Sequence, residues 1–186
     1  MHPTRHDGRA IGERLADVSR NDHLARLGCD GLYLTPLHPA RSNHRYDVAD
    51  HGAVDPLLGG DAALERLMRA CRERGLKVVL DMVINHVGSG HRWFNREGLF
   101  PGEEGAWQAP EGPRGEFFFI PRGRADHALL WKGIDTLVRL DLRSQRLRDE
   151  LWGEGGALVR WLRPPFEVDG YRFDCANMVG RAGAVQ

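Results

Sequence analysis

Residues 61–84 read DAALERLMRACRERGLKVVLDMVI, and this stretch decides the fold class. Its first half carries apolar side chains at helical spacing, namely Leu64, Leu67, Met68 and Cys71. The spacing predicts an amphipathic helix that Asp61 caps and Gly75 ends. Residues 76–84 are almost continuously apolar and rich in β-branched side chains, which is typical of a strand buried on both faces of a parallel sheet. The stretch therefore predicts a helix followed by a buried strand.

Similar units lie on both sides of this stretch. Upstream, a loose helical face (Ile11, Leu15 and Val18) ends by Gly28, and residues 31–35 are predicted as a short strand. Downstream, Ser144 is predicted to cap a helical segment that Gly155 and Gly156 interrupt, and residues 168–174 are predicted as a further strand. Alternating helices and strands favour a parallel sheet, so a Rossmann-like sheet and a (β/α)8 barrel both fit the pattern.

An irregular segment separates the second and third predicted strands. From about residue 88 the periodicity disappears while Gly, Pro, Trp and Phe accumulate, and the segment is too long for an ordinary connection. We therefore divide the chain into an N-terminal α/β part (residues 1–87), an insertion (residues 88–143) and a C-terminal helix and strand (residues 144–186).

Composition excludes several classes of protein. The 186 residues carry 26 basic and 26 acidic side chains, and this zero net charge argues against a general nucleic-acid binder. No apolar stretch approaches the roughly 18 residues that span a bilayer, so we expect no membrane partner. The three cysteines form no CxxC pair, which predicts neither a disulfide framework nor a zinc ribbon and favours a cytoplasmic location.

Polar side chains gather where the predicted strands end, which is where parallel α/β folds bind ligands. By alternation Asp81 and Asn85 share one side of the chain, and His86 follows directly. Arg172 and Asp174 likewise share one face, and the arginine favours the ionised carboxylate that a nucleophile requires. The alternative is structural: the first pair would tie down loops and the second would be a buried ion pair.

The loop at residues 42–47 reads SNHRYD and combines an aromatic ring with hydrogen-bonding groups. Tyr46 could stack on the apolar face of a pyranose while Asp47 and its polar neighbours bond the hydroxyl groups. A solvated turn is the alternative interpretation.

Together these motifs resemble a known family. DMVINH at residues 81–86 resembles the first conserved region of the α-amylase superfamily, glycoside hydrolase family 13, and GYRFD at residues 170–174 resembles its second. Residues 34–36 followed by residues 42–47 resemble the corresponding loop of the neopullulanase, cyclomaltodextrinase and maltogenic amylase branch. The resemblance implies a (β/α)8 TIM barrel, of which this chain supplies about strands two to four, with the insertion as its domain B.

The resemblance also implies roles for the motif residues. Asp174 would be the nucleophile that forms a glucosyl ester, and Arg172 would keep it ionised and oriented. Substrate binding would fall to Tyr46, His86 and Asp47, and Asp81 and Asn85 would support the site. Three tryptophans of the insertion are further candidates for sugar contacts: Trp93, Trp107 and Trp131.

The implied activity is retaining hydrolysis of an α-glucan or malto-oligosaccharide, without cofactor or metal. In the family the acid/base glutamate and a second aspartate follow later strands, beyond Gln186. We therefore expect a fragment, truncated at both ends, that does not catalyse alone. One alternative is a non-catalytic carbohydrate-binding remnant. Another is a metal-dependent hydrolase that would use His44, Asp81, His86 and Asp174.

Overall fold

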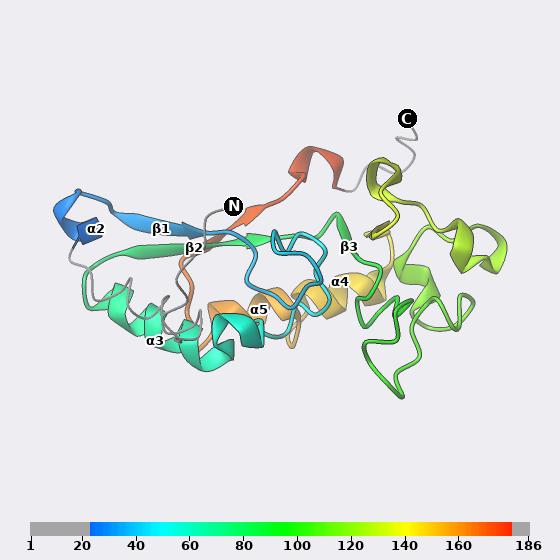
Figure 1. Ribbon diagram of the computed structural model, residues 1–186, viewed down its shortest axis with the longest axis horizontal. Coiled ribbons are helices and arrows are strands. Elements are labelled where there is room, and N and C mark those ends of the chain that lie inside the picture. Colours follow the sequence, from blue (N-terminus) through cyan, green and yellow to red (C-terminus); the bar gives the residue numbers. More distant parts are fainter. Residues whose placement is uncertain (1–22, 180–186) are drawn as a thin grey trace, which may run out of the picture.

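The computed structural model describes residues 23–179 and is built around a three-stranded parallel sheet (Figure 1). Strand β2 (Lys77–Met82) lies between β1 (Gly31–Leu34) and β5 (Gly170–Phe173). All three predicted strands and their parallel direction are confirmed. The predicted helical face at residues 11–18 lies outside the described residues, and from residue 23 onward the short helix α2 (His23–Arg26) precedes β1.

Helices cover one face of this sheet, as Figure 1 shows for α3 (Gly60–Arg72), α4 (Gln145–Trp152) and α5 (Ala157–Leu162). The side of α3 that faces the sheet is buried through the apolar positions that the sequence indicated: Leu64, Leu67, Met68 and Cys71. The opposite face of the sheet is partly open, because Tyr33 is 52% exposed there. Adjacent parallel strands with helices on one face form an arc of a (β/α) barrel, as predicted.

The start of α3 differs from the prediction. Gly59, not Asp61, is the N-cap, with a left-handed backbone at φ 95° that only glycine adopts without strain. Asp61 instead accepts a hydrogen bond from the Val54 amide at 2.9 Å and forms an ion pair with Arg160 of α5. The aspartate thus ties α3 to its neighbours and does not cap it.

The predicted break in the C-terminal helix is confirmed. Ser144 caps α4 by accepting a hydrogen bond from the Leu147 amide at 3.2 Å. The helical pattern breaks at residues 153–156, where a Cβ at Gly156 would lie 2.7 Å from the Leu151 carbonyl carbon. Glycine is required at this point because the end of α4 lies too close for any side chain.

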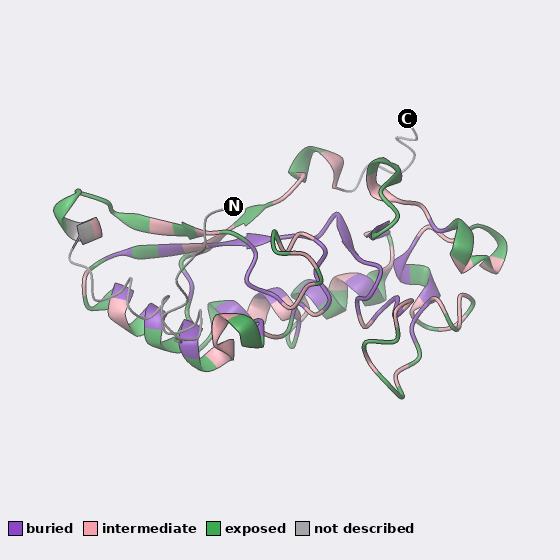
Figure 2. Ribbon diagram, in the orientation of Figure 1, coloured by how far each residue is buried: buried purple, intermediate pink, exposed green. Residues whose placement is uncertain are grey.

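The strand predicted at residues 76–84 ends two residues early, at Met82. The chain then enters β3 (His86–Gly88), which pairs antiparallel with β4 (Leu137–Arg139) and places His86 opposite Arg139. Residues 80–91 are buried without interruption, as Figure 2 shows around β3. The two-stranded ribbon therefore anchors the insertion to the sheet through a fully buried segment.

The insertion itself has little regular structure. Its remaining elements are short 3-10 turns, η2 (Gly115–Phe117), η3 (Pro121–Gly123), η4 (Ala125–His127) and η5 (Trp131–Gly133); two further turns, η1 (Pro56–Leu58) and η6 (Ala176–Met178), lie outside it. In the part of the chain that the structure describes, every helix is too short or too polar to cross a bilayer.

Candidate functional site

Three charged side chains form a continuous chain across β2 and β5. Because Asp81 and Arg172 are paired in register on adjacent strands, their side chains emerge side by side on the same face. One guanidinium nitrogen, Arg172 Nη1, donates to both oxygens of Asp81 at 3.1 and 3.0 Å and to Oδ1 of Asp174 at 2.8 Å. These two carboxylates raise the pKa of Arg172 above its ordinary value. Arg172 therefore holds Asp174 from one side while Asp81 holds Arg172.

Two tyrosines complete the bonding of Asp81, whose side chain is entirely buried. Tyr46 donates to Asp81 Oδ2 at 2.9 Å, and Tyr33 donates to the same oxygen. Burial and the hydrogen bond to this carboxylate raise the pKa of both phenols, so both remain protonated donors at neutral pH. Asp81 thus bonds both Arg172 and Tyr46.

Tyr33 is absent from the sequence-based site. It pairs with Val79, two residues before Asp81, so alternation places it on the same face of the sheet as the aspartate. The alternation along β1 is visible in the sequence. The position of Tyr33 beside Asp81, however, depends on the register between β1 and β2, which the sequence alone does not give.

His86 is 1% exposed and has one ring nitrogen without a partner. Its Nδ1 lies 3.1 Å from Nδ2 of the Asn85 side chain, whereas Nε2 has no hydrogen-bond partner among the described residues. Its ring stacks on Trp131 with centroids 5.1 Å apart. Burial lowers the pKa of His86 to about 4, so the ring is neutral at pH 7. A buried polar atom without a partner is unusual and marks a place where a ligand can complete the bonding.

Asp174, Tyr46 and His86 line one cavity of about 300 Å³. The other lining residues are His44, Trp131, Ile134, Leu137 and Cys175. Sheet and insertion both contribute to the wall, because His44, Tyr46 and Asp174 follow β1 and β5 while Trp131 and Leu137 come from the insertion. The structure therefore brings together four of the predicted residues, Asp174, Tyr46, His86 and Trp131, at one concave surface.

Asp47 lies apart from this cavity and lines a neighbouring one of about 370 Å³. Its Oδ2 accepts hydrogen bonds from the amides of Arg41 and Ser42, both at 3.1 Å, and its Oδ1 accepts from the Ser42 hydroxyl. The carboxylate thus holds its own loop in shape. The backbone carbonyl of Asn85 accepts from the Leu140 amide at 3.1 Å and joins the loop before β3 to the insertion.

The other two candidate tryptophans pack within the insertion. Trp93 is 5% exposed and lies 4.4 Å from the ring of His91, measured between centroids. Trp107 packs against Phe94, with centroids 5.8 Å apart. Neither lines the cavity, so of the three only Trp131 is placed to contact a ligand there.

A metal site receives no support from residues 23–179. Within that range no three His, Cys, Asp or Glu side chains are arranged to hold a metal ion. In His44, a residue of the metal alternative, Nδ1 accepts a hydrogen bond from the Tyr46 amide at 3.1 Å. Asp81 is likewise committed to tyrosine and arginine donors.

Comparison with known proteins gives a consistent result. The family model described as "Alpha amylase, catalytic domain" matches residues 4–185. The chain is 44% identical over 176 residues to a cyclomaltodextrinase of Geobacillus thermopakistaniensis, covering 90% of this chain and 27% of that protein. It is 29% identical over 190 residues to neopullulanase 2 of Thermoactinomyces vulgaris, covering 96% of this chain and 29% of that protein.

Among solved structures, the type III pullulan hydrolase from Thermococcus kodakarensis superimposes with a TM-score of 0.71 at 28% identity, over 91% of this chain and 27% of that one. Eubacterium rectale Amy13B gives a TM-score of 0.72 at 23% identity, over 93% of this chain and 34% of that one, which supports the fold alone. The chain spans less than a third of the length of these two curated relatives.

Proposed function

The chain belongs to the α-amylase catalytic-domain family, and we propose from that premise that it is part of an α-glucan hydrolase whose nucleophile is Asp174. One observation carries the proposal. Arg172 Nη1 bridges Asp81 and Asp174 at the wall of a cavity that Tyr46 and His86 also line. The nucleophile of a retaining glycosidase must be a carboxylate beside a sugar-sized space, and this arrangement supports Asp174 in that role.

The proposed reaction proceeds in two displacements. A carboxylate oxygen of Asp174 attacks the anomeric carbon as the glycosidic C–O bond breaks, and the leaving oxygen takes a proton from a carboxylic acid. Water then attacks the glucosyl ester, gives its proton to the same acid group and restores the free carboxylate. Arg172 stays protonated and bound to Oδ1 of Asp174 throughout, so it keeps the carboxylate in place for each cycle.

Sugar binding in the proposal uses the aromatic walls of the cavity. Tyr46 and Trp131 offer ring surfaces that suit the apolar face of a pyranose, and His86 Nε2 lacks a partner that a sugar hydroxyl would supply. Because His86 is neutral at pH 7, such a bond would need no charge and would survive across the neutral range. Malto-oligosaccharides and other α-1,4- or α-1,6-linked glucans are the proposed substrates.

The proton donor of this reaction lies outside the described cavity wall. A retaining glycosidase needs a second carboxyl group about 5 to 5.5 Å from the nucleophile. Among the described residues that line the cavity, Asp174 is the only one with a carboxyl group. We therefore propose that residues 23–179 supply the nucleophile and sugar-binding half of the site, and that the 186-residue chain alone binds glucans without turning them over.

A substrate that needs no proton donor tests the nucleophile directly. In 5-fluoro-α-maltosyl fluoride the anomeric fluoride leaves unprotonated and the ring fluorine slows hydrolysis of the resulting ester. We expect peptide mass spectrometry to find the maltosyl adduct on the peptide that contains Asp174. Asp174→Asn should abolish the adduct, and Asp126→Asn, which alters an exposed aspartate of the insertion, should leave it unchanged.

Calorimetry with maltotriose separates the remaining outcomes. Binding of maltotriose without any adduct would favour the carbohydrate-binding alternative over the hydrolase. An adduct on a residue other than Asp174 would contradict the assigned nucleophile. Absence of both binding and labelling would contradict the proposed function as a whole.

A further inference from the structure

A cysteine follows the proposed nucleophile and contacts it. The Cys175 Sγ lies 3.1 Å from Oδ2 of Asp174, and both residues line the 300 Å³ cavity in which His86 Nε2 lacks a partner. The backbone of Cys175 is left-handed, with φ 51° and ψ 33°, where β5 has ended and the chain turns into η6. This side chain was not among the candidates from the sequence, because its role depends on that turn.

The thiol holds its proton under ordinary conditions. Burial, together with the hydrogen bond to Asp174, raises the pKa of Cys175 to about 11. At neutral pH the group beside the carboxylate is therefore S–H and not S⁻, so it donates and does not repel. Cys175 is correspondingly a poor nucleophile itself, which leaves the carboxylate as the reactive group of the pair.

The two oxygens of Asp174 are consequently bound by unlike donors. Oδ1 accepts a charged hydrogen bond from Arg172 at 2.8 Å, whereas Oδ2 accepts from a thiol, which is a weak donor. The strongly bound Oδ1 has more of its charge neutralised. The weakly bound Oδ2 keeps more of its negative charge and loses little stabilisation when its hydrogen bond breaks. Oδ2 is therefore the better attacking atom.

We propose that Cys175 is a positioning residue that, through its S–H···Oδ2 hydrogen bond, fixes the rotation of the Asp174 carboxylate and presents Oδ2 to the anomeric carbon. This inference rests on the proposed function. In the step itself, Oδ2 forms the bond to carbon while the glycosidic bond breaks. The thiol proton stays on sulfur, and its hydrogen bond weakens as the charge on Oδ2 is consumed. No oxidation and no proton transfer involve Cys175.

Raman spectroscopy of the S–H stretch tests the contact without any need for activity. We expect one band of the wild-type chain to lie at lower frequency than that of a free thiol, and to be lost in Cys175→Ser. In Asp174→Ala this band should shift upward, because the acceptor is gone. Cys29→Ser, which alters an exposed thiol, should leave it in place. A band that does not move in Asp174→Ala would overturn the inference.

The rate of labelling by 5-fluoro-α-maltosyl fluoride tests the role. Cys175→Ala removes the donor and should slow labelling at saturating reagent by about threefold to tenfold, the effect of one weak hydrogen bond. Cys175→Ser keeps a donor of similar size and should restore most of the rate. Maltotriose affinity should be the same in both variants, because the thiol orients the nucleophile and does not bind the sugar.

The outcomes distinguish this inference from the proposed function. Equal losses in the alanine and serine variants would indicate packing and would contradict the positioning role, as would an unchanged rate in the alanine variant. A wild-type chain that is not labelled at all would contradict the proposed nucleophile, while the Raman band would still report whether the hydrogen bond exists.

Discussion

The helix-and-strand part of the molecule and the insertion at residues 88–143 are held together in different ways. The first buries a periodic set of apolar side chains between α3 and the sheet. The insertion also buries apolar side chains, among them Phe94 and Phe117, and adds charged and polar contacts between segments that are not adjacent in sequence. The candidate site lies where the two regions meet, since its cavity takes Asp174 from one and Trp131 from the other.

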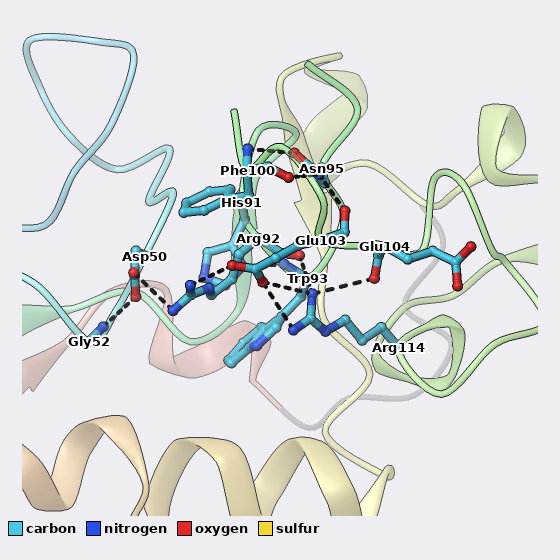
Figure 3. A network of polar contacts seen from close by, with 10 residues as sticks. All are labelled: Asp50, Gly52, His91, Arg92, Trp93, Asn95, Phe100, Glu103, Glu104 and Arg114. Atoms are coloured by element: carbon cyan, nitrogen blue, oxygen red, sulfur yellow. Dashed lines mark hydrogen bonds and ion pairs between the residues drawn. The ribbon is translucent and has the colours of Figure 1, made fainter. Parts of the chain in front are cut away.

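Figure 3 shows the polar network of the insertion. Arg92 reaches out of the insertion to Asp50 at 3.2 Å and also bonds Glu103 at 2.7 Å. Arg114 donates to the backbone carbonyl of Arg92 at 2.8 Å and to Glu103 at 3.3 Å. Asn95 bonds the carbonyls of Phe100 and Glu103. Local periodicity therefore specifies the first region, whereas the insertion, which lacks such periodicity, also depends on specific pairs such as Arg92 with Asp50 and Arg114 with the Arg92 carbonyl.

The largest expected effect is in the apolar region. Leu67 of α3 is 1% exposed, so Leu67→Ala should leave a cavity and lower the free energy of unfolding by about 2 to 5 kcal/mol. Urea unfolding followed by circular dichroism measures this loss. Leu57→Ala is the matched control, because Leu57 is 69% exposed and its truncation should change stability by no more than about 0.5 kcal/mol. Similar losses in both variants would contradict the assigned core.

Acid should weaken the junction between the two regions, where two buried histidines are linked. The Trp93 amide donates to His91 Nδ1 at 3.1 Å, so the His91 proton lies on Nε2 and is donated to His51 Nδ1 at 3.1 Å. His51 Nε2 in turn donates to the Val83 carbonyl at 2.8 Å. Burial lowers the pKa of both rings, that of His51 to about 3.

The folded chain therefore binds fewer protons than the unfolded chain between about pH 6.5 and pH 3, given an unfolded histidine pKa of about 6.5. Stability should fall as pH falls through this window, by at most about 1.4 kcal/mol per pH unit for each histidine. Unfolding by urea at a series of pH values measures the slope. His51→Gln should reduce it, whereas His127→Gln, at an exposed histidine, should not. An unchanged slope in His51→Gln would refute the assignment.

The smallest expected effect is in the polar network. Arg114→Ala should cost about 1 kcal/mol, because a partly exposed ion pair is screened by solvent while its hydrogen bond to a backbone carbonyl is lost. Hydrogen exchange should become faster around Arg92 and Glu103 and stay unchanged in α3. Arg146→Ala, at an exposed arginine, should alter neither region. Faster hydrogen exchange throughout the sheet would show that the two regions are not stabilised independently of each other.

The sequence predicted the helix-and-strand region because burial there follows from spacing within single elements. Its errors were at element ends. Gly59, and not Asp61, caps α3. The sequence did not indicate this cap because a left-handed glycine makes no side-chain hydrogen bond to the helix. The β3–β4 pairing joins residues about 50 positions apart, and no local pattern contains that information.

The sequence also predicted the part of the candidate site that follows from alternation within a strand. Alternation correctly placed Arg172 and Asp174 together, and their bonding to Asp81 follows from the register of β2 and β5. The composition of the loop could not show that the hydrogen-bond donors to the Asp47 carboxylate are amides of the same loop. It also could not indicate Tyr33 or Cys175, whose contacts arise only once strands and turns are formed.

We propose that a glucan binds between the two regions, and nuclear magnetic resonance of the isotope-labelled chain with maltotriose tests this placement. We predict chemical-shift changes on both sides of the cavity, at Tyr46 and Cys175 from one region and at Trp131 and Leu137 from the other. Changes confined to one region, or centred on residues that do not line this cavity, would contradict the account.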